Sequence, residues 1–477
     1  MKITFINVTN VIELNLGLAY VISSVENAGH EAALIDLAFA PSNYKHRWVI
    51  NKLRKQKPDI IGFSTMTCSY QESLQLAKKI KEEFSDIPLI WGGTHATILP
   101  EETLSNPLVD AICIGEGEEA LPEYLNKLEK GEKPYVKGIW YKENGKIIKT
   151  PLRPFIQNLD KLPFPNWNYW NIKEYLKLFG SLPLLASRGC PYNCSFCSTK
   201  VLSTRNIGAY FRLRTARNVI EEIKANIEKY RKFGLTTIIF QDPSFGIDKK
   251  QFNEFVSLYK KEKLDIFWTC TTRADIITKE WAKKAKISNC IMVELGLETG
   301  NEKRRIKIYN KVGLTNNKFK ACVKWLKRYD IPFLFFLLIG TPGENGRDIF
   351  ESIKFAETLE PNIICLGIYE PLPGTQLGEF CFSHGLINLN FNYDGLPRVE
   401  TENLCVEELD KIYLKLRIRG MKRVFLKNFT YFFTPPSLKK LVSDLLNRYK
   451  VKIIYQKDIL SHRLFVNALA TYFKYKR

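Results

Sequence analysis

Long hydrophobic segments are missing from the sequence. Its longest apolar run covers residues 333–339, far short of the roughly 20 residues that a membrane-spanning helix needs. The N-terminus lacks the basic segment and long apolar core of a signal peptide, and we interpret residues 1–8 as a first strand. We therefore expect a cytoplasmic protein. Its 477 residues, 45% hydrophobic and 25% charged, allow two or three globular domains.

Histidine is scarce, and the cysteines follow no regular framework. The five histidines lie at positions 30, 46, 95, 384 and 462. Eleven cysteines without regular spacing argue against a secreted disulfide scaffold. Three of them nevertheless share one short loop rich in Gly, Pro and Asn, with the spacing C-x3-C-x2-C: Cys190, Cys194 and Cys197.

No fourth cysteine lies near this loop, since the next one is Cys270. A cubane [4Fe–4S] cluster normally takes four thiolates, so three would leave one iron open to a ligand that is not protein. A zinc site would need a fourth Cys or His close by, and every histidine is distant in sequence. The loop therefore favours an open [4Fe–4S] cluster, with a small zinc site or unligated thiols as the alternatives.

Residues 1–130 alternate between strand-like and helix-like segments. Short apolar runs at 2–7, 31–36, 59–64, 88–92 and 109–114 flank helical patterns such as 71–84. This rhythm predicts a parallel sheet covered on both faces. Ligands of such sheets bind at the carboxyl ends of the strands. The candidate binding residues there are Ser64, Thr65, Gly92, Gly93, His95, Gly115, Glu116 and Gly117.

The rest of the chain divides into three parts. Residues 131–180 are interpreted as a linker with a small hairpin near 138–149. Residues 181–380 alternate strand and helix six times, with strands expected near 183–187, 236–241, 266–271, 291–297, 333–339 and 363–369. This pattern predicts a partial (β/α)6 barrel of the TIM type, with its chemistry at the carboxyl ends of the strands. Residues 381–477 form a basic, mainly helical C-terminal region.

The cysteine loop and the segments after the predicted barrel strands resemble the radical S-adenosylmethionine (SAM) superfamily. The three loops that carry the candidate binding residues, at 64–65, 92–95 and 115–117, resemble those of the Rossmann-like cobalamin (B12)-binding domain that precedes many of these enzymes. The resemblance implies a [4Fe–4S] cluster, SAM and cobalamin as cofactors. It extends to the class B methyltransferases, the anaerobic Mg-protoporphyrin cyclases and the hopanoid- and lipid-modifying group. The chain lacks the D-x-H-x-x-G motif of histidine-ligated cobalamin, so His30 and His95 are interpreted as structural rather than as cobalt ligands.

The resemblance also implies a set of SAM contacts at successive strand ends. Asp242 would meet the amino group, and Arg273 could bind a carboxylate with its planar fork. Glu298 would accept hydrogen bonds from the ribose. Gly340 would allow close approach to the adenine, and Tyr369 follows the sixth strand. The implied chemistry is reductive cleavage of SAM to methionine and a 5′-deoxyadenosyl radical, which abstracts hydrogen from an unactivated carbon.

The C-terminal region carries most of the charge. Residues 411–477 hold 17 Lys and Arg against two Asp, a net charge of +15 within the +21 of the whole chain. Basic residues mixed with aromatics fit an anionic membrane surface, RNA, or a solvated helical cap.

Three functions are considered from these features. The favoured one is cobalamin-dependent methylation or C–C bond formation on an apolar lipid or isoprenoid, at the membrane periphery. The alternative is a cyclase or methyltransferase for a tetrapyrrole, soluble metabolite or peptide. RNA modification of the methylthiotransferase kind is disfavoured, because residues 1–130 hold two cysteines rather than a second cysteine triad; nucleic acid is thus not an expected partner. An electron donor of the flavodoxin or ferredoxin type is the expected protein partner.

Overall fold

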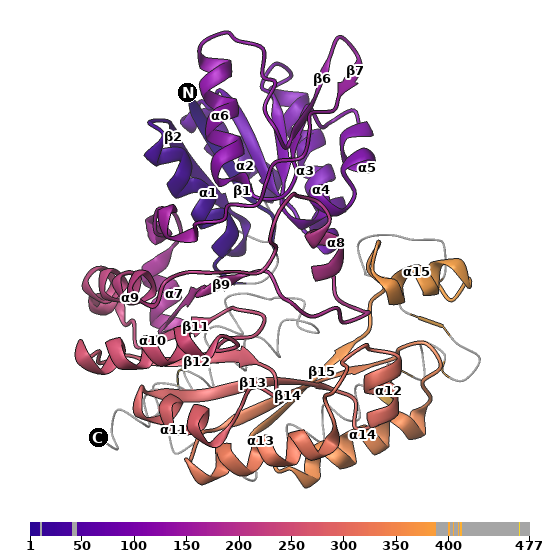
Figure 1. The fold of residues 1–477 in the computed structure, drawn as a ribbon. Coiled ribbons are helices and arrows are strands. Elements are labelled where there is room, and N and C mark those ends of the chain that lie inside the picture. The colour runs from indigo at the N-terminus through magenta and orange to yellow at the C-terminus, as the bar shows by residue number, and fades with distance from the viewer. Residues whose placement is uncertain are drawn as a thin grey trace.

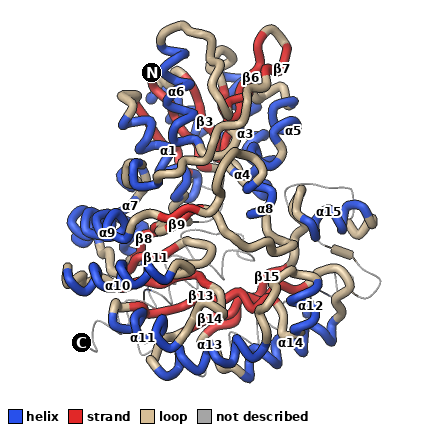
Figure 2. The backbone as a smooth tube through the Cα atoms, in the orientation of Figure 1, coloured by secondary structure: helices blue, strands red, loops and turns tan. Residues whose placement is uncertain are grey.

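The computed structural model describes residues 1–9, 12–40 and 45–387, together with residues 399–400, 404, 409, 411–412 and 467. The expectations for the basic C-terminal region therefore fall almost entirely outside the described residues. Figures 1 and 2 show an N-terminal sheet with its helices above a second sheet, joined by a long magenta connection. Among the described residues, no helix has the length and hydrophobicity that crossing a bilayer requires.

The N-terminal sheet has a parallel core of five strands, in the order β2-β1-β3-β4-β5. Apolar runs buried on both faces predict such strands, and five of the six residues of β1 are buried. The strands are β1 (Lys2–Asn7), β2 (Glu31–Asp36), β3 (Ile60–Ser64), β4 (Leu89–Gly92) and β5 (Ala111–Cys113).

Helices cover both faces of this sheet. On one face α1 packs against α6, and on the other α2 packs against α3, each over its own hydrophobic cluster. The cluster under α1 and α6 continues into the second domain without a break, so the two parts share one core. The helices are α1 (Leu16–Asn27), α2 (Lys45–Gln56), α3 (Tyr70–Glu83), α4 (Thr94–Ile98), α5 (Pro100–Ser105) and α6 (Gly117–Glu129).

The predicted hairpin forms, but it belongs to the N-terminal sheet rather than standing alone in a linker. Strands β6 (Ile139–Glu143) and β7 (Lys146–Ile148) continue the sheet in antiparallel fashion, with β6 paired to β5. The reason lies in burial, since Ile139, Trp140 and Tyr141 complete the cores on the two faces of the sheet.

The second sheet is the predicted open barrel of six parallel strands, in the order β8-β11-β12-β13-β14-β15. Each apolar run named from the sequence forms its strand, and the connecting helices line the outer side in Figure 1. The strands are β8 (Ser181–Leu184), β11 (Thr237–Phe240), β12 (Phe267–Thr272), β13 (Cys290–Glu298), β14 (Phe333–Ile339) and β15 (Ile363–Ile368). The main outer helices are α9 (Ala216–Tyr230), α10 (Lys249–Lys261), α11 (Lys279–Ile287), α13 (Asn316–Arg328) and α14 (Gly346–Thr358).

Small elements join the two sheets and carry the loops of interest. Helix α7 (Ile172–Phe179) leads into β8, and α8 (Thr199–Ser203) follows the cysteine loop. Strands β9 (Ser187–Arg188) and β10 (Arg212–Leu213) pair with each other in antiparallel fashion and frame the cysteine loop. Helices α12 (Glu302–Lys307) and α15 (Gln376–Ser383) lie beyond the ends of β13 and β15.

Candidate functional site

The three cysteines lie together just beyond the carboxyl end of β8. All three are partly exposed, unpaired thiols. Burial raises the pKa of Cys190 and of Cys194, and the neighbouring charge of Cys197 raises both further, so the three sulfurs lie within electrostatic reach of one another. Cys197 also contacts the hydroxyl of Thr199 at 3.1 Å.

These thiols fit an iron–sulfur cluster better than a single ion. Among the described residues, no three His, Cys, Asp or Glu side chains converge closely enough to hold one metal ion. A cluster offers a separate iron to each thiolate and so suits three sulfurs that do not converge.

A segment far away in the sequence supports the cysteine loop from behind. The backbone N–H of Ser195 donates to the carbonyl of Tyr309 at 3.2 Å, and its hydroxyl donates to the carbonyl of Ile308. The side chain of Asn310 donates to the carbonyl of Asn193 at 2.7 Å. Sequence reasoning missed this support, because nothing in the pattern after α12 marks it.

Asp242 lies at the end of β11 and is 1% exposed. Its carboxylate accepts hydrogen bonds from the backbone N–H of Ala186 at 3.0 Å and from the hydroxyl of Ser187 at 2.5 Å. Burial raises its pKa to about 6 despite these hydrogen bonds. Asp242 therefore holds the strand that leads into the cysteine loop, and its predicted contact with the SAM amino group stays a prediction.

Arg273 follows β12 and reaches the cysteine loop. Its guanidinium forms an ion pair with Asp275 at 3.0 Å and stacks 3.6 Å from the ring centroid of Tyr192, inside the loop. A planar cation on an aromatic face is a favourable contact. The predicted carboxylate contact of Arg273 remains a prediction, and the structure adds that Arg273 helps order the loop.

Glu298, at the end of β13, is paired with a residue that the sequence analysis did not name. Lys311 lies 2.6 Å from its carboxylate and is itself buried. The backbone of Glu298 has a positive φ of 60°, which is uncommon for a residue with a side chain. Its expected contact with ribose hydroxyls stays a prediction, and the structure shows a carboxylate already oriented by a lysine.

The ends of β14 and β15 approach the cysteine loop through a small apolar cluster. Gly340 has a φ of +78°, and its N–H donates to the buried carboxylate of Glu344 at 2.7 Å. Tyr369 is 2% exposed and packs with Tyr309 in a cluster that Phe196 of the loop adjoins. The adenine contact of Gly340 and the role of Tyr369 stay predictions.

The predicted corrinoid edge is assembled by strand register. Ser64 pairs with Gly92, so the loops after β3 and β4 leave the sheet side by side. Gly93 has a φ of +91°, and a Cβ there would lie 2.6 Å from the carbonyl oxygen of Thr65. Glycine is therefore required where the two loops touch.

A row of polar side chains extends this edge beyond the residues that the loops suggested. Asn7 donates to Asp36 at 3.0 Å, while Asn15 donates to Asn7 at 3.2 Å and to Ser64 at 3.4 Å. Burial raises the pKa of Asp36 to about 6. Asn7 and Asp36 are the last residues of β1 and β2. A polar residue at the end of a buried strand is the sequence feature that could have indicated them. This polar edge fits the amide-rich periphery of a corrinoid.

His95 is part of the core rather than of that edge. It is 0% exposed, stacks on Tyr70 with ring centroids 3.8 Å apart, and contacts the hydroxyl of Thr67 at 3.3 Å. Burial lowers its pKa to about 4. This placement is consistent with its interpretation as a structural residue, and its expected contact with the corrinoid stays a prediction.

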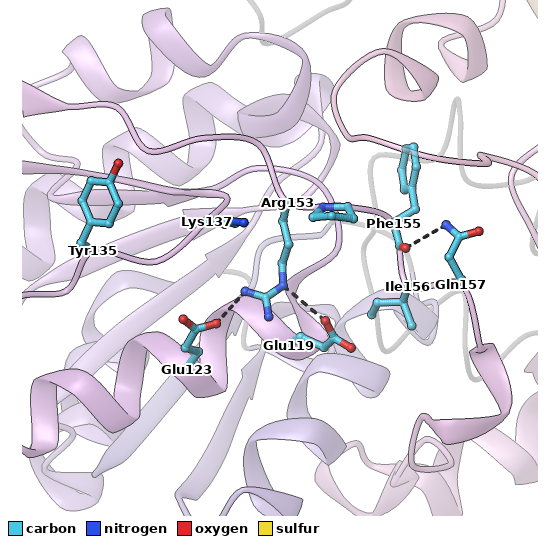
Figure 3. Close-up of a pocket in the computed structure, with 9 residues that line it drawn as sticks. Glu119, Glu123, Tyr135, Lys137, Arg153, Phe155, Ile156 and Gln157 are labelled. Atoms are coloured by element: carbon cyan, nitrogen blue, oxygen red, sulfur yellow. Dashed lines mark hydrogen bonds and ion pairs between the residues drawn. The ribbon is translucent and has the colours of Figure 1, made fainter.

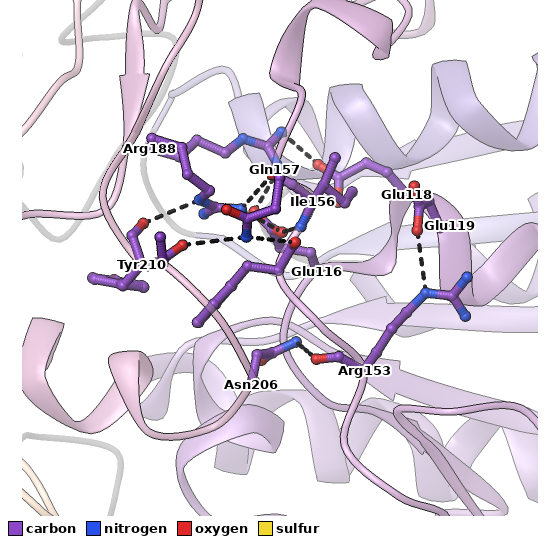
Figure 4. Close-up of polar contacts among 12 residues, drawn as sticks. Glu116, Glu118, Glu119, Arg153, Ile156, Gln157, Arg188, Asn206 and Tyr210 are labelled. Carbon is purple, nitrogen blue, oxygen red and sulfur yellow. Dashed lines mark hydrogen bonds and ion pairs between the residues drawn. The ribbon is translucent and has the colours of Figure 1, made fainter.

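The third loop, with Gly115, Glu116 and Gly117, contacts β9, the strand that leads into the cysteine loop. Gly115 has a φ of +81° and lies against the side chain of Asn206. Glu116 forms an ion pair with Arg188 at 3.1 Å (Figure 4). It forms a second ion pair with Arg212 at 2.8 Å. Its carboxylate is thus committed to the strands that frame the cysteine loop, whereas the backbone of the loop remains the predicted corrinoid contact.

A separate surface cavity of about 480 Å³ lies along the connection between the sheets (Figure 3). Arg153 stands in it between two glutamates of α6, 3.3 Å from Glu119 and 2.7 Å from Glu123. Its remaining walls come mainly from residues 154–157. None of the three cysteines lines this cavity, so it is distinct from the cysteine site.

Comparisons with known proteins divide the chain in the same way. Residues 3–125 match the B12 binding domain family, and residues 184–356 match the radical SAM superfamily. The uncharacterized methyltransferase PH0819 of Pyrococcus horikoshii is 32% identical over 412 residues, which cover 84% of this chain and 86% of the relative.

More distant relatives have named activities. The anaerobic magnesium-protoporphyrin IX monomethyl ester cyclase of Rubrivivax gelatinosus is 27% identical over 69% of this chain, although the match spans 59% of the cyclase. The hopanoid C-3 methylase of Methylococcus capsulatus is 26% identical over 76% of this chain and 67% of the methylase.

Solved structures share the fold. The cobalamin-dependent SAM radical enzyme OxsB, with aqua-cobalamin bound, aligns with a TM-score of 0.71 at 17% identity, covering 100% of this chain and 81% of OxsB. The methyltransferase TsrM from Kitasatospora setae, with cobalamin and a [4Fe–4S] cluster bound, aligns with a TM-score of 0.67 at 15% identity, covering 85% and 80%.

These matches, with the cysteine loop, identify the cofactors as a [4Fe–4S] cluster, SAM and cobalamin. Cys190, Cys194 and Cys197 remain the residues predicted to hold the cluster. The chain belongs to the radical SAM superfamily, and it is an enzyme of the group of methyltransferases and cyclases that carry an N-terminal B12-binding domain.

Proposed function

We propose that this enzyme methylates, or joins through a new C–C bond, an unactivated carbon of an apolar substrate such as a lipid or isoprenoid. The observation that carries the proposal is the contact between Glu116 and Arg188. It brings the carboxyl edge of the N-terminal sheet against the strand that enters the cysteine loop. One substrate carbon can then reach chemistry supplied from both domains.

The bound cofactors supply reducing power for SAM cleavage and a methyl carrier, and the chain supplies binding and orientation. The cysteine loop would hold the cluster, with Asp242 and Arg273 ordering it through Ser187 and Tyr192. Glu298 would bind the SAM ribose in an orientation set by Lys311. No side-chain acid or base is assigned, because hydrogen abstraction by a carbon radical requires none.

The apolar substrate is supported by what the relatives are named for. The hopanoid relative supports a lipid substrate. The magnesium-protoporphyrin ester and the bacteriochlorophyllides are tetrapyrroles, so those relatives support the tetrapyrrole alternative, although such macrocycles also carry extensive apolar surface. The alternative is a tetrapyrrole, a soluble metabolite or a peptide, and the cytidylyl-2-hydroxyethylphosphonate methyltransferase of Streptomyces wedmorensis, 23% identical, favours keeping a polar substrate in the test.

The test supplies SAM carrying a trideuteromethyl group, together with a low-potential reductant, to the anaerobically reconstituted enzyme. Organic extracts and aqueous extracts of cells are offered as separate substrate sources. We expect the trideuteromethyl label in a compound that partitions into the organic phase. Label confined to aqueous compounds would reject the apolar substrate, and SAM cleavage with unlabelled products would favour ring formation over methylation.

Location and partners follow from the same proposal. We propose that the enzyme is cytoplasmic, associates with membranes through its basic C-terminal region, and receives electrons from a flavodoxin or ferredoxin. We also propose the division into residues 1–130, 131–180, 181–380 and 381–477, amended by the hairpin that extends the N-terminal sheet.

A further inference from the structure

We propose that Glu116 is a positioning residue for the cluster: through Arg188 it fixes β9, the strand that leads into Cys190, against the edge of the N-terminal sheet. The inference rests on the proposed function in one respect: it takes the carboxyl edge of the N-terminal sheet as the side that binds the corrinoid. It assigns Glu116 to the cysteine loop of the other domain, a role distinct from the corrinoid contact expected of its position.

Four charged side chains form the interdomain ion-pair network: Glu116, Glu118, Arg188 and Arg212. Figure 4 labels the first three of them. Arg188 uses both ends of its fork, meeting Glu116 at 3.1 Å and Glu118 at 2.5 Å. The other oxygen of Glu116 accepts from Arg212 at 2.8 Å and from the N–H of Ile156 at 2.8 Å. Two carboxylates and two guanidinium groups therefore balance one another.

The network is buried, unlike an ordinary surface ion pair. The side chains of Glu118 and Arg212 are 4% and 5% exposed, and those of Arg188 and Glu116 are 13% and 14% exposed. Burial alone would raise the pKa of Glu116, but the hydrogen bond from Arg212 and the charge of Arg188 hold that pKa below its usual value. Removing the charge of Glu116 takes away the carboxylate partner of Arg212 and one of the two partners of Arg188, and leaving a buried charge poorly paired is costly.

The chain path carries this constraint to the cluster ligand. Arg188 stands two residues before Cys190, with Gly189 between them at a φ of +78°. A Cβ on Gly189 would lie 2.2 Å from the carbonyl oxygen of Tyr210, so the backbone is pressed against the β10 side. Arg188 also pairs directly with Arg212 in the β9–β10 ladder. Because one tightly packed residue separates Arg188 from Cys190, a displacement of Arg188 also displaces Cys190.

A buried ion-pair network is a poor means of adding stability, since apolar side chains of similar volume often do as well. Its advantage is direction, because a guanidinium fork held by two carboxylates has one preferred orientation. Arg188 additionally lies 4.8 Å from the ring centroid of Tyr20 on α1, a further contact with the N-terminal domain. The arrangement suits positioning more than simple adhesion between domains.

The test measures alkylation of the three cysteines by iodoacetamide in the full-length, cluster-free protein, site by site by mass spectrometry. Glu116→Gln keeps the shape of the side chain and removes its charge. We expect the alkylation rate at Cys190 to rise roughly tenfold relative to that at Cys197. Loss of a hydrogen bond between charged groups changes by about that factor the fraction of molecules in which β9 is held against the N-terminal sheet. Arg188→Gln should do the same, and the double variant should add little to either.

The matched control is Glu119→Gln. Glu119 lies on α6, close in sequence to Glu116, and its substitution removes an ion pair with Arg153 but no contact with β9 or β10. It should leave the Cys190 to Cys197 ratio unchanged. Equal ratios in wild type and Glu116→Gln, or a double variant whose effect is the product of the two single effects, would overturn the proposal.

Two further measurements keep the result decisive. If Glu116→Gln does not fold, Arg188→Lys replaces it, since lysine keeps the charge but cannot hold both glutamates, and the same selective rise at Cys190 is expected. In the reconstituted enzyme, Glu116→Gln should alter the electron paramagnetic resonance spectrum of the reduced cluster, and Glu119→Gln should not. Neither readout involves substrate, so the positioning role can fail or stand independently of the proposed substrate.

Discussion

The Nζ of Lys311 lies 2.6 Å from a carboxylate oxygen of Glu298, and both groups are largely enclosed beside the cysteine loop. Lys311 also donates to the carbonyl of Gly296 at 2.9 Å. Its charge acts on Cys194, where it lowers a thiol pKa that burial raises. One lysine thus orients the predicted ribose ligand and favours the thiolate form of a predicted cluster ligand.

We expect Lys311→Met to weaken SAM binding by roughly tenfold or more, because the variant removes a hydrogen bond between charged groups and leaves Glu298 unpaired in a buried site. The measurement is the dissociation constant for SAM in the reconstituted protein. Lys307→Met, at an exposed position on α12, is the matched control. Unchanged SAM affinity in Lys311→Met would show that Glu298 does not depend on Lys311.

The triple variant Cys190→Ala, Cys194→Ala and Cys197→Ala should lose both its iron and SAM cleavage. Wild-type protein reconstituted without oxygen should hold about four irons per chain, as a single cubane cluster requires. Cys68→Ala, which removes an exposed thiol of the N-terminal domain, should keep that iron content. Retained iron in the triple variant, or about eight irons in wild type, would contradict the single-cluster assignment.

The N-terminal domain should retain about one corrinoid per chain after incubation with hydroxocobalamin and desalting, as a one-site domain of this fold would. His95→Gln should retain the same amount, because His95 packs against Tyr70 within the core. The reduced cobalt should show no nitrogen hyperfine splitting from a protein ligand. Loss of corrinoid in His95→Gln with an unchanged fold would reinstate His95 as a ligand.

Burial of His95 predicts a specific dependence of stability on pH. Its folded pKa, about 4, lies below the usual 6.5, so the unfolded chain binds the proton more readily between these values. Stability contributed by neutral His95 is therefore complete above about pH 6.5 and is lost as pH falls, by about 1.4 kcal/mol per pH unit within the window. Urea unfolding of wild type minus His95→Gln should show this slope.

The same subtraction with His384→Gln is the control, since His384 is exposed on the surface. Asp36 and Asp242, whose pKa values are raised, act in the opposite direction, and the subtraction cancels their contributions. A flat difference between wild type and His95→Gln from pH 4 to 6.5 would mean that the ring is hydrated in solution.

The basic C-terminal region should bind anionic vesicles. Its net charge of +15 over residues 411–477 would contribute on the order of 1 kcal/mol per well-placed Lys or Arg near the surface, and added salt should weaken the attraction. Truncation after Asp410 should abolish co-sedimentation with phosphatidylserine vesicles and leave SAM cleavage largely intact. Full-length protein that ignores such vesicles at low salt would favour a soluble substrate.

Features that depend on short stretches of chain were predictable from the sequence. The spacing of Cys190, Cys194 and Cys197 states a cluster motif within eight residues, and each buried strand is an apolar run that carries its own signal. Strands β14 and β15 begin and end within a residue of the expected 333–339 and 363–369. These local patterns also predict the order of strands and helices along the chain, and that order predicts the fold class.

The hairpin shows where that reasoning stops. Residues 139–148 were recognised as two strands, but nothing local indicates which sheet they join. The open edge of β5 and the apolar cover that Ile139, Trp140 and Tyr141 provide decided it. Edge pairing depends on which hydrogen-bonding edge is left available, and that is known once the other strands are in place.

What the sequence by itself determined is the identity of the chemistry, because the cysteine motif and the strand-end residues are local. The tertiary structure alone decided which partner each charged side chain takes. Glu116 meets Arg188 across 72 positions, Asp242 holds Ser187 across 55, and Lys311 comes back to Glu298 after a further helix. A carboxylate can serve equally well as ligand, anchor or ion pair, and the choice depends on which opposite charges the packed fold buries beside it.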